Sequence, residues 1–303
     1  MAIAPSGEQF EIRSGDQRAT IVEVGAGLRT YSVGERAVLN PYPPDAMSDG
    51  AHGAVLVPWP NRLADGRYSF AGRDHQVALT EPDLHNAIHG FLRWRPWRAV
   101  EQSRRRVVMA NRLYPLTGYP FGLDVAVDYS LSEAGLVVRT TATNIGDEPC
   151  PYGCGHHPYL SPGAGQVDDC TLELPAGTRL LTDERQLPSG AEPVEGTPFD
   201  FRRSRRIGAL EIDCPFTGLE TDSEGGSVTR LTGSDGRTVE LWADATYPFL
   251  EVYTGDTLAP GRRRTGVAVE PMTCPPNALQ TGENLIVLEP DESVTTTFGV
   301  RLT

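Results

Sequence analysis

The sequence predicts a mainly β protein built as one large antiparallel β-sandwich, and two observations indicate this. Short apolar runs rich in β-branched and aromatic residues recur along the 303 residues, and many of them alternate with a period of two. The chain also contains 32 glycines and 25 prolines, and no segment longer than about ten residues keeps the 3.6-residue repeat of an amphipathic helix.

Twelve runs are the expected strands. The clearest is LDVAVDYSLS, whose apolar residues from Leu123 to Leu131 alternate and should all point to one side. In chain order the runs are ATIVEVGAG, AVLVPWP, RYSFAGRDHQVAL, RRVVMANRL, LDVAVDYSLS, GLVVRTTATNIG, CTLELPAG, VTRLTG, TVELWAD, FLEVYTG, GVAVEPM and VTTTFGVRL. The stretch from Pro188 to Pro198 is richest in loop residues, but no linker or change of composition divides the chain. We therefore expect a single domain over residues 1–303.

Charge and cysteine content narrow the class of protein. The net charge of -13 argues against nucleic acid or an anionic membrane as a partner, because both would be repelled. The N-terminus lacks a basic segment followed by an apolar one, and no run approaches the roughly 18 apolar residues of a membrane span. We expect a cytoplasmic protein. Its five cysteines, an odd number, should be reduced thiols.

The stretch GCGHHPY, residues 153–159, holds two adjacent histidines. Gly155 allows a close approach and Pro158 restricts the backbone, so an imidazole between them can be held in one orientation. Period two predicts that one histidine faces a pocket, as an acid or base, while its neighbour faces away. Zinc ligation with the nearby cysteines is the alternative, but C-x-x-x-C-x-H-H lacks the usual C-x-x-C spacing, so we expect no metal.

The stretch PWPNR suggests a carbohydrate pocket. The guanidinium of Arg62 offers a planar fork of donors for hydroxyl groups, Asn61 lies beside it, and Trp59 could form an apolar wall. Such a combination suits a sugar, which has hydroxyl edges and apolar faces. A capped turn with a solvated arginine is the alternative interpretation.

Two carboxylates also stand out. Glu270 ends a short apolar run and precedes Pro271, which should stop the strand, so its carboxylate lies either in water at a sheet edge or at a cavity mouth. Asp213, in EIDCPFTGL, lies between Ile212 and Cys214, and an aspartate in such a place commonly caps a turn. The motifs GxGxxG, GxxxxGK[ST], GxSxG and HExxH are absent, so the dinucleotide, nucleotide, serine-hydrolase and zincin classes lack their usual support.

Taken together, these stretches resemble the aldose 1-epimerases, or galactose mutarotases, over residues 55–280. The matching motifs in chain order are PWPNRLADGRYSFAGR, NAIHG, HHPYL, IDCPFTGL, LEVYTG and VAVEPMTCPPNA. The family folds as a large β-sandwich, and its members interconvert the α and β anomers of a free hexose without a cofactor. The resemblance implies an isomerase whose partner is a small-molecule sugar, as a monomer or homodimer.

The resemblance also assigns roles. It implies that Glu270 is the catalytic base and that His157, rather than His156, is the acid. It implies a substrate-binding role for Arg62, His89, Asp213 and Asn61, and Trp59 or Trp94 could cover an apolar face of the sugar. Here His156 and Leu160 replace the family's frequent Asn and Phe, so the sugar itself stays open. Three alternatives remain: a non-catalytic sugar-binding sandwich, a glycoside hydrolase using Asp213 and Glu270, and a hexose 6-phosphate epimerase, for which the candidate phosphate ligands are Arg93, Arg95 and Arg262 to Arg264.

Overall fold

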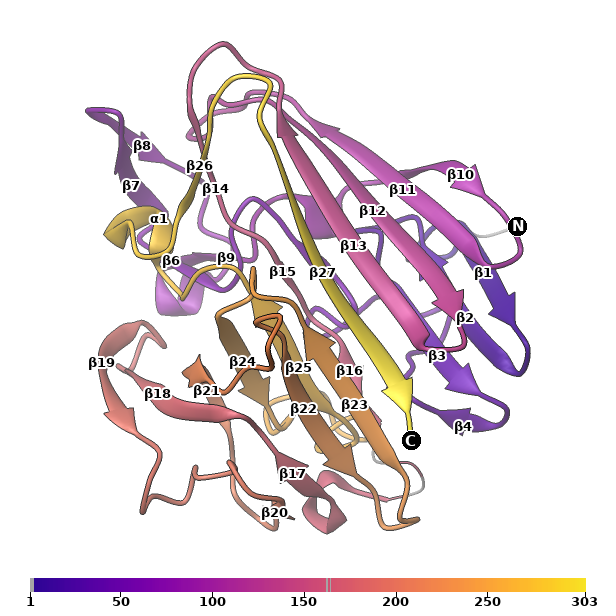
Figure 1. The fold of residues 1–303 in the computed structure, drawn as a ribbon. Helices are drawn as coiled ribbons and strands as arrows, with labels where there is room; N and C mark the ends of the chain where they lie inside the picture. Colours follow the sequence, from indigo (N-terminus) through magenta and orange to yellow (C-terminus); the bar gives the residue numbers. More distant parts are fainter. Residues whose placement is uncertain (1–2, 162, 164) are drawn as a thin grey trace.

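The computed structural model describes residues 3–161, 163 and 165–303, and almost all of its regular structure is β (Figure 1). The largest sheet has nine strands, and its neighbouring strands pair antiparallel. In spatial order they are β10 (Arg98–Gln102), β11 (Arg106–Leu113), β12 (Leu123–Ser132), β13 (Gly135–Asn144), β27 (Ser293–Leu302), β23 (Thr238–Ala243), β22 (Ser227–Thr232), β17 (Thr171–Glu173) and β20 (Arg205–Arg206).

A second sheet of eight strands is also antiparallel. Its strands in spatial order are β19 (Pro188–Pro193), β18 (Ala176–Thr182), β21 (Asp213–Leu219), β24 (Phe249–Tyr253), β25 (Val267–Met272), β15 (Gly155–His156) and β5 (Val55–Leu56), and β16 (Tyr159–Leu160) also pairs with β25. This sheet carries the candidate site.

Smaller elements complete the chain. A four-stranded sheet comprises β1 (Gln9–Ser14), β2 (Gln17–Val22), β3 (Leu28–Val33) and β4 (Arg36–Ala37). Three strand pairs are β6 (Arg62–Ala64) with β9 (Asn86–Ile88), β7 (Arg67–Phe70) with β8 (Arg73–Gln76), and β14 (Cys150–Tyr152) with β26 (Ile286–Leu288). The helices are η1 (Pro82–Leu84), η2 (Leu92–Trp94), η3 (Val167–Asp169) and α1 (Ala278–Thr281). In the described part of the chain, none is long and apolar enough to span a membrane.

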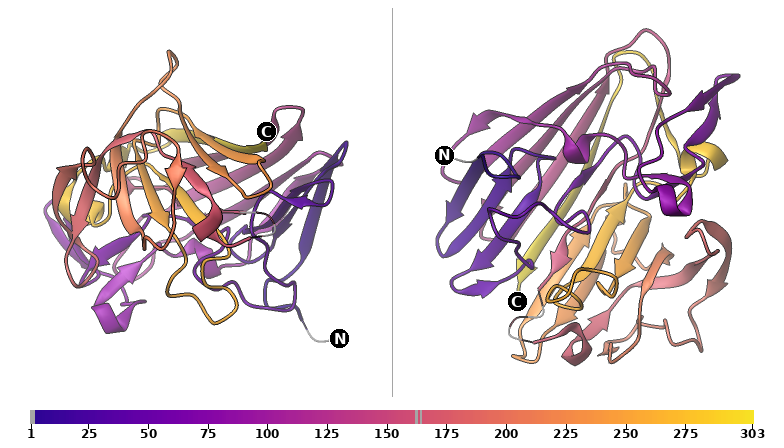
Figure 2. Two further views of the ribbon diagram at one scale, coloured as in Figure 1. Left: turned by 90° about the horizontal axis from the view of Figure 1, so that it is seen from below. Right: turned by 180° about the vertical axis from the view of Figure 1, so that it is seen from behind.

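The apolar faces of the sheets share one core. Residues of β12, β13 and β27 join residues of β21, β24 and β25 in a single buried cluster, which also includes β1 and β2 of the four-stranded sheet. Figure 2 shows from two further sides how the four-stranded sheet lies beside the nine-stranded sheet, where β1 contacts β11 and β12. The prediction of a mainly β, antiparallel protein is therefore confirmed.

The predicted runs locate part of the strands. Each of the twelve overlaps at least one strand, and LDVAVDYSLS coincides with β12, whose alternating apolar residues are buried as expected. Other strands, among them β1, β3, β14 and β21, lie outside the predicted runs. All five cysteines are buried and free, which confirms the prediction of unpaired thiols.

Two predictions about proline were wrong. Strand β25 does not stop at Glu270 but continues through Pro271 to Met272, so Glu270 lies inside a sheet. The loop-rich stretch from Pro188 begins with β19, because the outermost strand of a sheet tolerates prolines, which cannot donate a ladder hydrogen bond.

The burial of Phe298 in the core leads to a prediction about the free energy of unfolding. Phe298, on β27, is 1% exposed and packs against the rings of His156 and Tyr247. Phe298→Ala should lower the free energy of unfolding by about 3–5 kcal/mol in urea denaturation, because it removes buried apolar surface and leaves a cavity. The control Val100→Ala, at a position that is 52% exposed, should change it by about 0.5 kcal/mol or less. Equal effects of the two substitutions would contradict this description of the core.

Candidate functional site

The candidate site is a cavity of about 460 Å³ on the eight-stranded sheet. Strands β21, β24 and β25 contribute one wall, and the segments around Asn61, His89 and His157 contribute another. Residues 257–259, in the loop between β24 and β25, line it from a third side. The cavity therefore brings together residues that lie far apart in the sequence, from Ser48 to Glu270.

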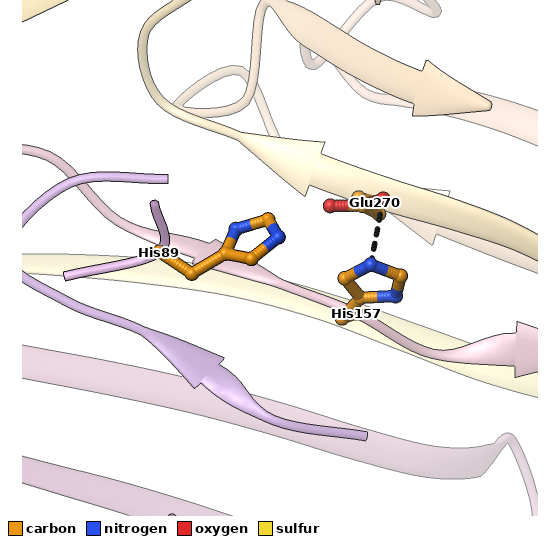
Figure 3. A group of neighbouring side chains, drawn as sticks. All are labelled: His89, His157 and Glu270. Atoms are coloured by element: carbon orange, nitrogen blue, oxygen red, sulfur yellow. Dashed lines mark ion pairs between the residues drawn. The ribbon is translucent and has the colours of Figure 1, made fainter. Parts of the chain in front are cut away.

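His157 and Glu270 meet inside this cavity (Figure 3). Nε2 of His157 lies 3.1 Å from Oε1 of Glu270, and both side chains are almost fully buried. Burial lowers the pKa of His157 to about 3 and raises the pKa of Glu270 well above its usual range. At this separation the two atoms share one proton, so the pair can be a neutral imidazole with a carboxylic acid or an imidazolium with a carboxylate. The two forms differ only in where that proton lies.

A stack of rings fixes the orientation of the His157 imidazole. The Tyr159 ring lies nearly parallel to it with centroids 5.1 Å apart, and the His52 ring stacks on Tyr159 at 3.6 Å. The Tyr159 hydroxyl donates a hydrogen bond of 2.8 Å to the carbonyl of Gly50. His156 points elsewhere, with Nε2 2.8 Å from the Thr140 hydroxyl. The adjacent histidines thus serve different environments, as their alternation predicted.

His89 follows β9 with a left-handed backbone (φ 63°), and its imidazole reaches the cavity. Its Nδ1 accepts a hydrogen bond of 3.1 Å from the backbone N–H of Asn61. The neutral ring therefore carries its proton on Nε2, which makes that nitrogen a donor.

The same tautomer argues against a metal centre at this site. One ligand atom each from His89, His157 and Glu270 lie within 4.8 Å of one another, which would suit a metal ion. However, Nδ1 of His89 already accepts the Asn61 N–H and Nε2 carries the proton, so neither lone pair is free to bind a metal.

Asn61 and Arg62 both line the cavity, but each already has a protein partner. Arg62 uses Nε and Nη2 to bind Glu81 at 2.9 and 3.0 Å, which leaves Nη1 for another acceptor. Asn61 Nδ2 donates to Oε2 of Glu251 at 3.1 Å. Asn61 therefore positions its neighbours as well as lining the cavity.

Asp213 is the first residue of β21 and also lines the cavity. Its side chain is exposed to solvent, yet enough protein packs around it for desolvation to raise its pKa. The charge of Arg62 acts in the opposite direction. Asp213 thus lies in the sheet rather than in a turn.

Trp59 was expected to form the apolar wall, and this prediction was wrong. Its side chain is 2% exposed and packs edge-to-face on Phe91 in the core, with ring centroids 4.8 Å apart, since burial of the large indole favours the core. The aromatic wall at the cavity is Trp94, which is 46% exposed.

Most of the candidate phosphate-binding arginines support the scaffold instead. Arg262 donates to the ring of His52 and to the carbonyl of Pro41, and Arg264 binds Asp168 at 2.7 Å. These bonds anchor the loop after β24. Arg263 donates to the Leu258 carbonyl, and Arg95 is exposed outside the cavity.

Arg93 is different because it lines the cavity beside Trp94, with its guanidinium carbon 5.0 Å from the centre of the indole ring. Among the described residues, its guanidinium has no carboxylate partner within ion-pair distance.

The sequence reasoning did not identify Glu81 and Glu251. Glu251 had a signal, because it interrupts the apolar strand FLEVY as Glu270 interrupts VAVEPM. Glu81 had none, since its role follows only from the fold, which places it against Arg62.

Comparisons with known proteins identify the family of the chain. The family model described as Aldose 1-epimerase matches residues 8–301. The uncharacterized protein YihR of Escherichia coli (strain K12) is 37% identical over 94% of this chain and 90% of its own length. The galactose mutarotase of Homo sapiens is 29% identical over 84% of this chain and 80% of its own.

Solved structures share the fold. The GalM/aldose epimerase homologue from C. elegans superposes with a TM-score of 0.86 at 18% identity, over 98% of both chains. Galactose 1-epimerase from Lactobacillus acidophilus gives 0.79 at 20% identity, over 96% of this chain and 92% of its own. With a family match over nearly its whole length and the fold of these relatives, the chain belongs to the aldose 1-epimerase family.

Proposed function

We propose that the protein is an aldose 1-epimerase that interconverts the α and β anomers of a free hexose by acid/base-catalysed ring opening. The observation that supports this most directly is the contact between His157 and Glu270 at 3.1 Å inside a cavity of sugar-compatible size and chemistry. Relatives with the names aldose 1-epimerase and galactose mutarotase add support.

The chemistry requires an acid and a base close together, because a hemiacetal carries its hydroxyl oxygen and its ring oxygen on the same carbon. Glu270, as a carboxylate, takes the proton of the C1 hydroxyl, and His157, as an imidazolium, gives a proton to the ring oxygen. The bond between C1 and the ring oxygen breaks, and the C1 hydroxyl oxygen becomes an aldehyde carbonyl. After rotation about C1–C2, the same two groups return the protons in the reverse direction and close the other anomer.

Other residues of the cavity would hold the sugar. The Nε2–H of His89 and the free Nη1 of Arg62 can donate to hydroxyl oxygens, and the carboxylate of Asp213 can accept from a hydroxyl. Trp94 can cover an apolar face of the ring.

Substitution of the two reacting groups tests the proposal. Glu270→Gln and His157→Asn should each lower kcat by about 100- to 10,000-fold, because each removes one positioned proton transfer. Polarimetry of freshly dissolved α-glucose and α-galactose measures this rate. The control His85→Asn, at a side chain that is 66% exposed, should keep the wild-type rate. A non-catalytic sugar-binding protein would bind these sugars without accelerating their anomerisation, and that result would refute the proposal.

Arg93 supports a second candidate, a hexose with an anionic group such as a 6-phosphate. An arginine that is surrounded by protein without a carboxylate partner is unfavourable, and burial lowers the pKa of Arg93. A phosphate oxygen would supply the missing partner. Of the five arginines considered for this role, Arg93 alone lines the cavity.

A comparison of free sugars with glucose 6-phosphate distinguishes the two candidate functions. If the substrate is a free hexose, wild-type protein should accelerate glucose or galactose at least as well as glucose 6-phosphate, and Arg93→Gln should change kcat/KM for the free sugar less than threefold. If the substrate is phosphorylated, Arg93→Gln should lower kcat/KM for glucose 6-phosphate by about 10- to 100-fold, since it removes a charge-assisted bond. Arg95→Gln is the matched control. Acceleration of the phosphorylated sugar alone would overturn the first candidate.

A further inference from the structure

Two buried glutamates face one another across strands β24 and β25. Glu251 and Glu270 are direct cross-strand partners in the antiparallel register, and they are 4% and 2% exposed. Side chains of such partners lie on the same face of the sheet with Cβ atoms about 4.5–5.5 Å apart, where like charges are destabilising. Both residues line the cavity.

The pair lacks the cations that usually accompany buried carboxylates. Glu240 shows the ordinary arrangement, since it is 7% exposed, binds Arg230 and Arg301, and has a lowered pKa. In the described part of the chain, no arginine lies within ion-pair distance of Glu251. Arg62, the nearest candidate, pairs with Glu81 instead.

We infer that Glu251 is a neutral carboxylic acid at neutral pH and that it donates its proton in a hydrogen bond to the Glu270 carboxylate. Oε2 of Glu251 accepts from Asn61 Nδ2, so Oε1 is the atom left for the proton. Oε2 of Glu270 is buried and has no partner, so it needs a donor from the same sheet face. The two glutamates then carry one negative charge between them.

The position of His157 decides which glutamate is charged. With Glu270 ionised, its carboxylate lies 3.1 Å from an imidazole that can be protonated. With Glu251 ionised, the charge would face only the amide of Asn61, while a protonated Glu270 would adjoin the imidazole. The first arrangement lets the charge accept from Nε2–H of the imidazole, a more acidic donor than the Asn61 amide, and is therefore favoured.

The surrounding groups agree with this assignment. Burial and the charge of Asp213 on β21 raise the pKa of both glutamates, and the charge of Arg62 on β6 partly opposes this. His89 presents a neutral ring, and burial raises the pKa of the Cys214 thiol on β21 to about 12, so neither group carries a charge at neutral pH. Arg62 is itself paired with Glu81, so among the described residues no cation forms an ion pair with Glu251 that would stabilise a second negative charge.

The consequence concerns catalysis, and this part rests on the proposed function. A neutral Glu251 holds Glu270 in place through a hydrogen bond and keeps the negative charge on the group that acts as base. Glu251 is thus a positioning residue, and its effect should be visible in the pH dependence of the reaction.

Infrared difference spectroscopy of the intact protein at neutral pH tests the protonation without any sugar. The spectrum of wild type minus Glu251→Gln should contain the carbonyl band of a protonated carboxylic acid. The matched control, wild type minus Glu240→Gln, should contain only carboxylate bands, because Glu240 is paired with two arginines. Absence of the acid band from the first spectrum would overturn the inference. If Glu251→Gln does not fold, wild-type protein labelled with 13C at glutamate carboxyls provides the same test, and a spectrum with only ionised carboxyls at neutral pH would overturn it.

The pH dependence of kcat/KM tests the role in positioning. In wild type, raising the pH removes the proton of Glu251, so the hydrogen bond to Glu270 is lost and kcat/KM should fall. Glutamine cannot ionise and can still donate, so in Glu251→Gln the alkaline fall should move to higher pH by at least one unit, whereas Glu251→Leu should lose at least tenfold in kcat at all pH values. An unchanged alkaline limb in the glutamine variant would overturn the positioning role. If the acid band is present but no sugar is anomerised, the proposed function fails and the protonation stands.

Discussion

The site depends on placing ionisable side chains inside a β-sheet, where water cannot solvate their charges. Glu251 and Glu270 lie on the inner part of two central strands, and His157 is buried opposite them. Such groups persist only where a neighbouring group shares a proton or supplies a hydrogen bond. His157 lies 3.1 Å from Glu270, and Asn61 lies 3.1 Å from Glu251. The hydrogen bond inferred between the two glutamates would join these contacts and meet this requirement.

Hydrogen bonds elsewhere in the fold hold the segments that line the cavity in position. Arg185, in the connection between β18 and β19, donates to the carbonyls of Leu84 and His85. Asn86 Nδ2 donates to the carbonyl of Arg185 in return. These bonds hold the segment that leads into β9 and His89 against the eight-stranded sheet. Because they join residues about 100 positions apart, the shape of the cavity depends on the whole fold.

The features of the fold and of the cavity that could be predicted are those that produce a recognisable pattern in the sequence. Alternation located β12 and the other strands because a half-buried strand repeats every two residues. The resemblance named His157, Glu270, Arg62, His89, Asn61 and Asp213, and all of them line the cavity. The prediction that Trp59 lines the cavity was wrong, since an aromatic residue next to prolines can face either the core or a cavity.

The hydrogen-bond partners of these residues were harder to predict from the sequence. Glu81 lies 19 positions from Arg62, and only the pairing of β6 with β9 and the turn before β9 bring the two together. Glu251 carried the same signal as Glu270, a carboxylate within an apolar strand, but its meaning depends on the register that places it opposite Glu270. Register between strands is a tertiary property, so a single sequence does not reveal it.

The stacked rings of His157, Tyr159 and His52 also affect which groups near the cavity are charged. His52 lies at its far end, where its Nε2 accepts a hydrogen bond from Nη2 of Arg262, and a nitrogen can accept only if it is unprotonated. Burial and the charge of Arg262 lower the pKa of His52 to about 3, so this ring stays neutral. A charged His52 would repel an imidazolium at His157 through the intervening Tyr159 ring. Arg262 thereby anchors the loop beside the cavity and keeps His52 uncharged, so His52 does not oppose protonation of His157 if that residue acts as the acid of the proposed reaction.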